Sequence, residues 1–142
     1  MSVKQVSVFI ENKRGRLIAV TSCLAKKNVN IRAISASDTA DYGILRLIVD
    51  QPDLAAQALK EAEFTVRVTD VIAVTAEDKP GGLNHVLEIL RDHGINVDYI
   101  YAFFNQPVTT LNLIKVDQPE AAEAALQQAG VRLLTAAEVY GG

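Results

Sequence analysis

The sequence has a single cysteine, Cys23, and no run of apolar residues long enough to span a membrane. A lone cysteine excludes an internal disulfide, which fits a reducing compartment. A spanning helix needs about 20 consecutive apolar residues, so no membrane partner is expected. The N-terminus passes directly into strand-like sequence, and we therefore expect no signal peptide and a cytoplasmic location.

The sequence also lacks an excess of basic charge. Its 14 lysines and arginines face 17 aspartates and glutamates, for a net charge of −3. That balance argues against a strongly basic nucleic-acid-binding protein. With 142 residues, of which 49% are hydrophobic and 22% charged, the chain is expected to fold as one ordinary domain or two very small ones.

The most informative feature is an internal repeat. In its first part, a shift of 66 residues aligns Val8 with Val74, Glu11 with Glu77, Lys13 with Lys79, and Gly15 with Gly81. Further on the shift becomes 67, because the tetrapeptide Val-Asp-Gln-Pro occurs at 49–52 and again at 116–119. Two repeats are too few for a solenoid. The sequence therefore predicts two copies of one small domain, 1–68 and 69–142.

Each copy has the hydrophobic pattern of β-α-β-β-α-β. The first copy predicts strands at 6–10, 29–37, 44–49 and 64–68, with helices from Leu17 and from Pro52. The second predicts strands at 71–74, 95–104, 109–116 and 131–134, with helices from Leu83 and from Pro119. Turns are expected at 38–41 and 105–107. The predicted fold is α+β: two tandem ferredoxin-like units, each an antiparallel sheet with both helices on one face.

One predicted strand is apolar on both faces. Tyr99, Tyr101 and Phe103 alternate with Ile100, Ala102 and Phe104. The face away from the helices is therefore expected to be covered by the other copy or by another subunit, and we expect a homodimer. The alternative is an aromatic-rich strand that tolerates exposure.

The loop after the first strand of each copy carries a recognisable pattern. A strand is followed by Asn/Asp-Lys-x-Gly-x-Leu, then a helix, then Val-Asn-Ile or Ile-Asn-Val. The second copy shows it at 77–83 and 94–97, and the first at 11–17 and 28–31. Both copies resemble the ACT domain, and the resemblance covers nearly the whole chain. The first copy has Arg14 where the common pattern has the proline found at Pro80.

The resemblance implies a regulatory protein without a catalytic domain, similar to stand-alone tandem ACT proteins. ACT domains pair side by side and bind amino acids between the paired domains. The loop, the start of the first helix and the partner's second strand hold the ligand. Carried to this sequence, the binding residues are Asn12, Arg14, Gly15, Arg16, Leu17, Asn30 and Ile31 in the first copy and Asp78, Pro80, Gly81, Gly82, Leu83, Asn84, Asn96 and Val97 in the second.

Elementary chemistry favours the same loops. Glycines at a helix N-terminus let the backbone approach a carboxylate, which the unpaired N–H groups and the dipole attract. Asn12 or Asp78 could accept a hydrogen bond from an amino group, while Asn30 and Asn96 can donate and accept. Leu17 and Leu83 hint at a small or aliphatic ligand side chain. The alternative is that the glycines only serve turns.

Catalysis is not expected. Cys23 lies among Val20 and Leu24 on an apolar helical face, typical of a core residue and not of a nucleophile. His85 and His93 have no ligand neighbour at metal spacing, so no metal and no cofactor are expected. His85 stands near a helix start, where exposure to solvent is favoured over ligand contact. No nucleotide-binding or catalytic-triad motif is present.

Two further functions remain open as alternatives. An RNA-binding sheet needs exposed aromatics on its central strands. The second copy has Tyr99 and Tyr101, but the first has Ala33 and Ser35 in matching places. We therefore expect no nucleic-acid partner. A protein-interaction or oligomerisation module that acts on a separate biosynthetic enzyme, without a ligand, is the other alternative.

Overall fold

The computed structural model describes residues 2–38, 42–103 and 109–141. The first half contains β1 (Val3–Glu11), α1 (Arg16–Lys26), β2 (Ile31–Asp38), β3 (Tyr42–Val49), α2 (Pro52–Glu61) and β4 (Thr65–Glu77). The second half contains α3 (Gly82–Asp92), β5 (Val97–Phe103), β6 (Thr109–Val116), α4 (Pro119–Gln128), β7 (Leu133–Leu134) and α5 (Ala136–Gly141). No helix in these ranges is long and apolar enough to cross a membrane.

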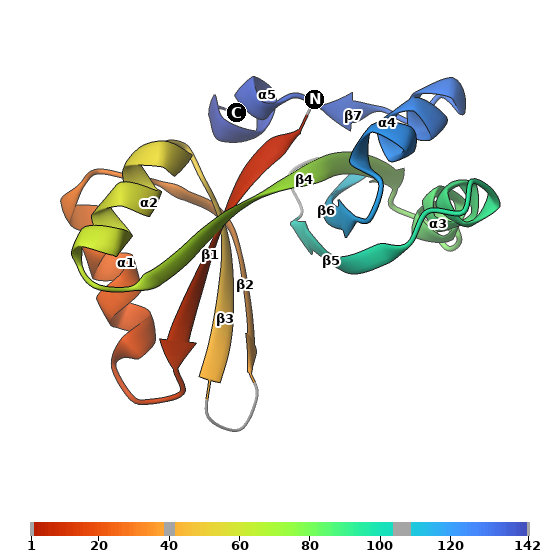
Figure 1. The fold of residues 1–142 in the computed structure, drawn as a ribbon. Coiled ribbons are helices and arrows are strands. Elements are labelled where there is room, and N and C mark those ends of the chain that lie inside the picture. Colours follow the sequence, from red (N-terminus) through yellow and green to blue (C-terminus); the bar gives the residue numbers. More distant parts are fainter. Residues whose placement is uncertain (1, 39–41, 104–108, 142) are drawn as a thin grey trace. The chain divides into compact units, whose positions relative to one another are not determined.

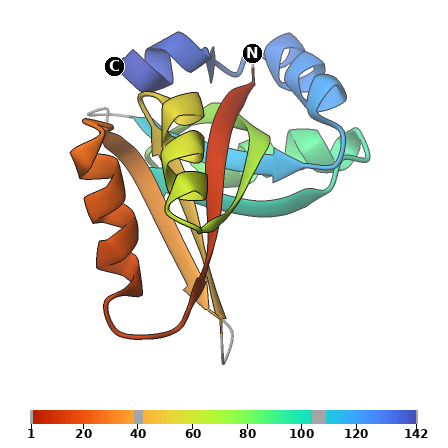
Figure 2. The same ribbon diagram turned by 60° about the vertical axis from the view of Figure 1, so that its left-hand side comes forward.

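The contacts divide the chain into two compact units. The N-terminal unit comprises Lys4–Thr69 with Tyr140, and the C-terminal unit comprises Asp70–Val139 with Val3. The strand order is β2-β3-β1-β4 in the first and β5-β6-β4-β7 in the second. Strand β3 is antiparallel to β1 and β2, and β6 is antiparallel to β4 and β5. Helices α1 and α2 lie on one face of the N-terminal sheet (Figures 1 and 2). The predicted pair of ferredoxin-like units is confirmed.

Each unit has a core between its sheet and its two helices. In the N-terminal unit the core comprises Val6, Val8, Val20, Leu24, Val29, Leu45, Leu47, Val49, Ala55 and Leu59. In the C-terminal unit it comprises Ile72, Val74, Ala76, Val86, Leu90, Ile95, Ile114, Val116, Ala122, Leu126 and Leu133. Alternate strand residues and one stripe of each helix supply these side chains, as the periodicities of 2 and 3.6 require.

One core position differs in polarity between the copies. Asn112 of β6 corresponds to Leu45 of β3 in the repeat and is only 3% exposed. Its Nδ2 donates to Thr110 Oγ1 at 3.1 Å and more distantly to the Val74 carbonyl at 3.5 Å. A buried amide needs such partners, so the C-terminal unit has a small polar cluster within its core.

Left-handed residues end all four long helices. Asn28 (φ 58°) and Gly94 (φ 67°) follow α1 and α3, and both are residue types that indicate a left-handed helix end in a sequence. Glu63 (φ 70°) and Gly130 (φ 81°) follow α2 and α4. At each end the next amide bonds back to a carbonyl in the last turn, namely Val29 to Leu24, Phe64 to Leu59, Ile95 to Leu90 and Val131 to Leu126.

The repeated tetrapeptide has a structural role in both units. The carboxylate of Asp50 accepts a hydrogen bond from the Asn30 amide at 2.9 Å, and Asp117 does the same for Asn96 at 2.9 Å. The following glutamine donates to the carbonyl of the residue that ends the preceding helix, at 3.3 Å in each copy. The proline then begins the second helix. The motif thus fixes the start of the second strand against the start of the second helix.

The structure differs from the sequence-based prediction in three places. The strands predicted at 64–68 and 71–74 are one strand, β4, because no glycine or proline interrupts 65–77. The strand predicted at 131–134 is reduced to β7. Helix α5 is not anticipated, although Thr135 and Glu138 form a capping box at its start. Residues 39–41 of the first predicted turn, the whole predicted turn at 105–107 and Phe104 lie outside the described residues.

Candidate ligand-binding loops

The two loops that follow β1 and β4 have the same backbone geometry. Gly15 (φ 85°, ψ −5°) and Gly81 (φ 84°, ψ −4°) occupy the N-cap positions of α1 and α3. In each loop a lysine amide donates back to the glutamate carbonyl two residues earlier, at 2.8 and 2.9 Å. Only glycine adopts this left-handed conformation without strain. The repeat therefore reproduces a specific turn, and not only a hydrophobic pattern.

Both helix N-termini lack a side-chain cap. Glycine has no side chain to offer, and no side-chain cap hydrogen bond is found at either start. The amide of Gly82 donates to the Lys79 carbonyl at 3.0 Å. Amides in a first helical turn and the positive end of the helix dipole favour an anion.

Each loop carries one acidic and one basic side chain in contact. Lys13 Nζ lies 2.8 Å from Glu11 Oε2, and Lys79 Nζ lies 2.6 Å from Glu77 Oε2. The lysine hydrogen bond and charge lower the pKa of the glutamate in both loops, and the same bond raises the pKa of Lys13. Exposed ion pairs of this kind are weak. The lysine and the glutamate of each pair can therefore separate and bind the carboxylate and the ammonium group of a zwitterion instead.

The N-terminal unit has a cavity of about 270 Å³ beside its loop. Its walls come from the end of β1, the loop, the start of α1 and the ends of β2 and β3. The lining residues are Ile10, Glu11, Asn12, Lys13, Arg16, Leu17, Ala36, Ser37, Gly43 and Ile44. The structure therefore brings together three predicted residues, Asn12, Arg16 and Leu17. Arg14 and Gly15 are exposed in the loop and do not line it.

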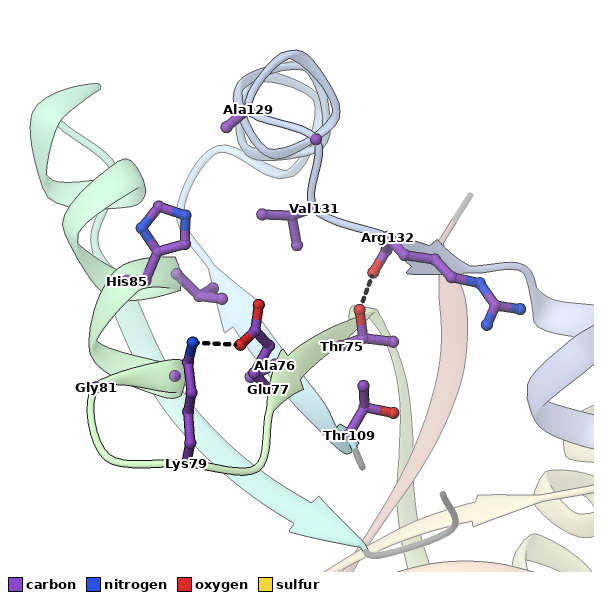
Figure 3. A pocket seen from close by; sticks show the side chains of 13 residues that line it. Thr75, Ala76, Glu77, Lys79, Gly81, His85, Thr109, Ala129, Val131 and Arg132 are labelled. Carbon is purple, nitrogen blue, oxygen red and sulfur yellow. Dashed lines mark hydrogen bonds and ion pairs between the residues drawn. The ribbon is translucent and has the colours of Figure 1, made fainter. Parts of the chain in front are cut away.

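The C-terminal unit has a larger cavity, of about 490 Å³, on the helix side of its loop (Figure 3). The lining residues are Thr75, Ala76, Glu77, Lys79, Gly81, Gly82, His85, Val86, Thr109, Ala129, Gly130, Val131 and Arg132. Of the predicted residues only Gly81 and Gly82 take part. The sequence favours solvent exposure over ligand contact for His85. Its side chain is exposed, and it also lines this cavity. Val131 and Arg132 come from the connection after α4, a segment without any motif that could have indicated it.

The remaining predicted residues lie elsewhere. Asn30, Ile31, Asn96 and Val97 follow the far ends of α1 and α3, so an 11-residue helix of about 16 Å separates them from the loop of their own unit. That these four residues share a site with the loop of a paired unit stays a prediction. Asp78, Pro80 and Leu83 are exposed, and Asn84 Nδ2 donates to Glu88 Oε1 at 2.7 Å.

The residues singled out for catalysis have ordinary surroundings. Cys23 is half-buried, with its Sγ 3.6 Å from the Ala58 carbonyl of α2. His93 Nδ1 lies 2.8 Å from the Ile89 carbonyl at the end of α3. Across 2–38, 42–103 and 109–141, no three His, Cys, Asp or Glu side chains are grouped so that they could hold a metal ion.

Comparison with solved structures gives two levels of similarity. The chain is 40% identical to protein BT0572 from Bacteroides thetaiotaomicron, with a TM-score of 0.94, covering 99% of this chain and 96% of that one. It is 19% identical to the regulatory subunit of aspartate kinase from Thermus thermophilus in its ligand-free form, with a TM-score of 0.64 over 89% of this chain and 91% of that one. The second likeness concerns the fold alone. No curated protein matches the sequence.

The sequence profile of the ACT domain pair matches residues 1–137, nearly the whole chain. The match includes both glycine loops and all four long helices. It agrees with the two ferredoxin-like units and with the repeat of the loop geometry described above. The chain therefore belongs to the ACT domain pair family.

Proposed function

We propose that this protein is a non-catalytic regulator that binds an amino acid, or a similar small carboxylate, at its glycine loops. In this proposal each loop acts together with the second strand of a paired ACT unit. The observation that carries it is the repeated loop itself. An uncapped helix N-terminus behind a left-handed glycine stands beside a lysine and a glutamate in both copies.

The loop chemistry matches both ends of a free amino acid. The helix N-terminus and the lysine ammonium attract a carboxylate. The glutamate, assisted by Asn12 or Asp78, accepts hydrogen bonds from an ammonium group. Both glutamates are charged at neutral pH, and the lysine contacts lower their pKa further below the ordinary value. The loops thus offer opposite charges a few ångströms apart, as a zwitterion requires.

The similar proteins support a regulatory role. One of the solved structures is a regulatory subunit of aspartate kinase, a chain of comparable length and fold. We infer by analogy that this protein passes a signal to a separate metabolic enzyme in the cytoplasm. We also propose that it forms a homodimer, which light scattering would detect as twice the 15.4 kDa chain mass. A monomer at micromolar concentration would contradict the dimer.

A thermal-shift screen against the twenty amino acids tests ligand binding. A ligand that binds only the folded state adds about 2.7 kcal/mol of stability at a hundred times its dissociation constant. We expect one chemical class to raise the melting temperature. If no amino acid does so at millimolar concentration, the ligand-free interaction module becomes the better explanation.

Two glycine variants localise the binding. Gly81→Val forces a β-branched residue into the left-handed region within the loop, and Gly94→Val does the same at the other end of α3. An added Cβ meets no atom within 4 Å at either position, so the two variants share the same backbone strain without a clash at Cβ. We expect Gly81→Val to lose the ligand-induced shift and Gly94→Val to keep it. Equal binding by both would overturn the site.

A further inference from the structure

The counterparts of the residues that line the C-terminal cavity are divided between two cavities in the N-terminal unit, and two substitutions within the repeat contribute to the difference. Gly82 at the start of α3 corresponds to Arg16 at the start of α1, and Val131 corresponds to Phe64. The Arg16 guanidinium carbon lies 4.9 Å from the centre of the Phe64 ring. Its Nε is buried, without a hydrogen-bond partner among the described residues. This stacked pair stands at the start of α1, and Arg16 lines both N-terminal cavities.

Glycine and valine leave the same space open in the C-terminal unit. A Cβ on Gly82 would overlap the Glu77 carbonyl, so the helix start can approach the end of β4 only without a side chain there. The N-terminal unit does have a groove between α1 and α2, but none of its lining residues belongs to β1. The C-terminal cavity, by contrast, is lined by the end of β4, the loop, the first turns of α3 and the connection after α4.

The cavity has an uncharged wall and charged residues at its rim. Ala76 and Val86 are buried, at 5% and 3% exposed, Val131 is half-buried, and Thr75 and Thr109 add hydroxyl groups to the wall. The Glu77–Lys79 pair and the His85 imidazole are exposed at its edge. In Figure 3, His85, Val131 and the ion pair all face one space. The Arg132 guanidinium is engaged outside it, 2.8 Å from Glu138.

This distribution selects a class of ligand. A zwitterionic head group finds both signs of charge at the rim, while a charged ligand side chain would lose its hydration against uncharged walls. A volume of about 490 Å³ lies at the lower end of the range for small-molecule sites. Valine, alanine and threonine side chains line the wall, which suits an aliphatic or hydroxyl-bearing ligand side chain.

We propose that the C-terminal cavity binds a free amino acid with an uncharged side chain, and that the N-terminal unit, where the corresponding space is divided, has no equivalent site. The proposal takes its class of ligand from the proposed function. It differs in placing a site inside one unit, on the helix side of the loop, with Val131 and His85 among its walls. The two copies of the repeat are then functionally different.

Titration of ¹⁵N-labelled protein with L-valine, L-alanine and L-serine tests the location, with L-aspartate and L-lysine as charged counterparts. We expect the three uncharged ligands to shift the amides of Gly82, His85, Gly130 and Val131, with at least tenfold weaker effects from the charged pair. Shifts confined to the 11–17 loop or to the strands β2 and β5 would overturn the cavity and leave the proposed function standing. No shifts with any amino acid would contradict both.

Two variants test the walls. Val131→Phe introduces the residue of the N-terminal unit and should weaken L-valine binding at least tenfold, whereas Phe64→Val alters the matching position of the other unit and should leave it unchanged. His85→Ala introduces the residue found at Ala19 and should weaken binding about threefold to tenfold. Because His85 is exposed, this variant remains informative if Val131→Phe does not fold. Unchanged affinity in His85→Ala and in folded Val131→Phe would refute the assignment.

Discussion

Glu63 has the backbone conformation of a glycine. Among the described residues only it and Asn28 combine a side chain with a positive φ, and asparagine tolerates that region better than glutamate does. The corresponding residue after α4 is Gly130, with φ 81° against 70°. The repeat therefore provides two versions of one helix end, one strained and one relaxed.

The energy of this strain follows from the backbone. A side chain in the left-handed region costs about 1–2 kcal/mol. Replacing it by glycine also increases the conformational entropy of the unfolded chain, which lowers the stability by about 0.4–1 kcal/mol. We expect Glu63→Gly to stabilise the protein by about 1 kcal/mol, which corresponds to a melting temperature about 3 °C higher for a chain of this size. The Glu63 amide keeps its 3.0 Å bond to the Lys60 carbonyl, because the backbone does not change.

Urea denaturation followed by circular dichroism measures the effect. Gly130→Ala is the reverse experiment: an added Cβ meets no atom within 4 Å, so its cost, about 1 kcal/mol, should come from φ alone. Gly130→Asn should cost less than Gly130→Ala. A Glu63→Gly variant less stable than the parent would refute the reasoning, since it would mean that the side chain contributes more than the strain costs.

Two other perturbations test the polar contacts. Thr135→Ala removes the hydroxyl that accepts from the Glu138 amide at 3.2 Å, and it should cost about 1 kcal/mol in a urea titration. The Thr135 amide lowers the pKa of Glu138, so the stabilisation from this carboxylate is complete above its ordinary pKa and is lost as the pH falls through the lower, folded value. The stability difference between the parent and Glu138→Gln should therefore narrow below about pH 4, and a difference that stays constant down to pH 3 would contradict this role. Asn112→Leu should stabilise the C-terminal unit by about 1 kcal/mol, because the repeat already holds Leu45 at that place; a loss of stability would show that the buried amide bonds matter more.

The elements could be predicted because their signals are local. Pro52 and Pro119 begin helices and Asn28 and Gly94 end them, since each residue limits its own backbone angles. The uninterrupted course of β4 was missed, because a repeat suggests a boundary where the backbone needs none.

The candidate site was less predictable. Gly81 could be found because a left-handed turn requires glycine, whereas Gly82 is required by its close approach to the Glu77 carbonyl. The cavity behind them depends on which side chains from distant segments are missing or small. Val131 helps to open the cavity because it is smaller than Phe64, and no sequence motif indicates this difference. Comparison of the two copies position by position would have shown the difference, but not the space that it opens.

Strand β4 also limits how this protein can evolve by recombination. Its residues up to Thr69 belong to one unit and those from Asp70 to the other, without a loop between them. Val3 clusters with the C-terminal unit and Tyr140 with the N-terminal one. No single break in the gene would thus release two complete domains. The duplicated halves are inherited together, and recombination could join them to another protein only as a pair.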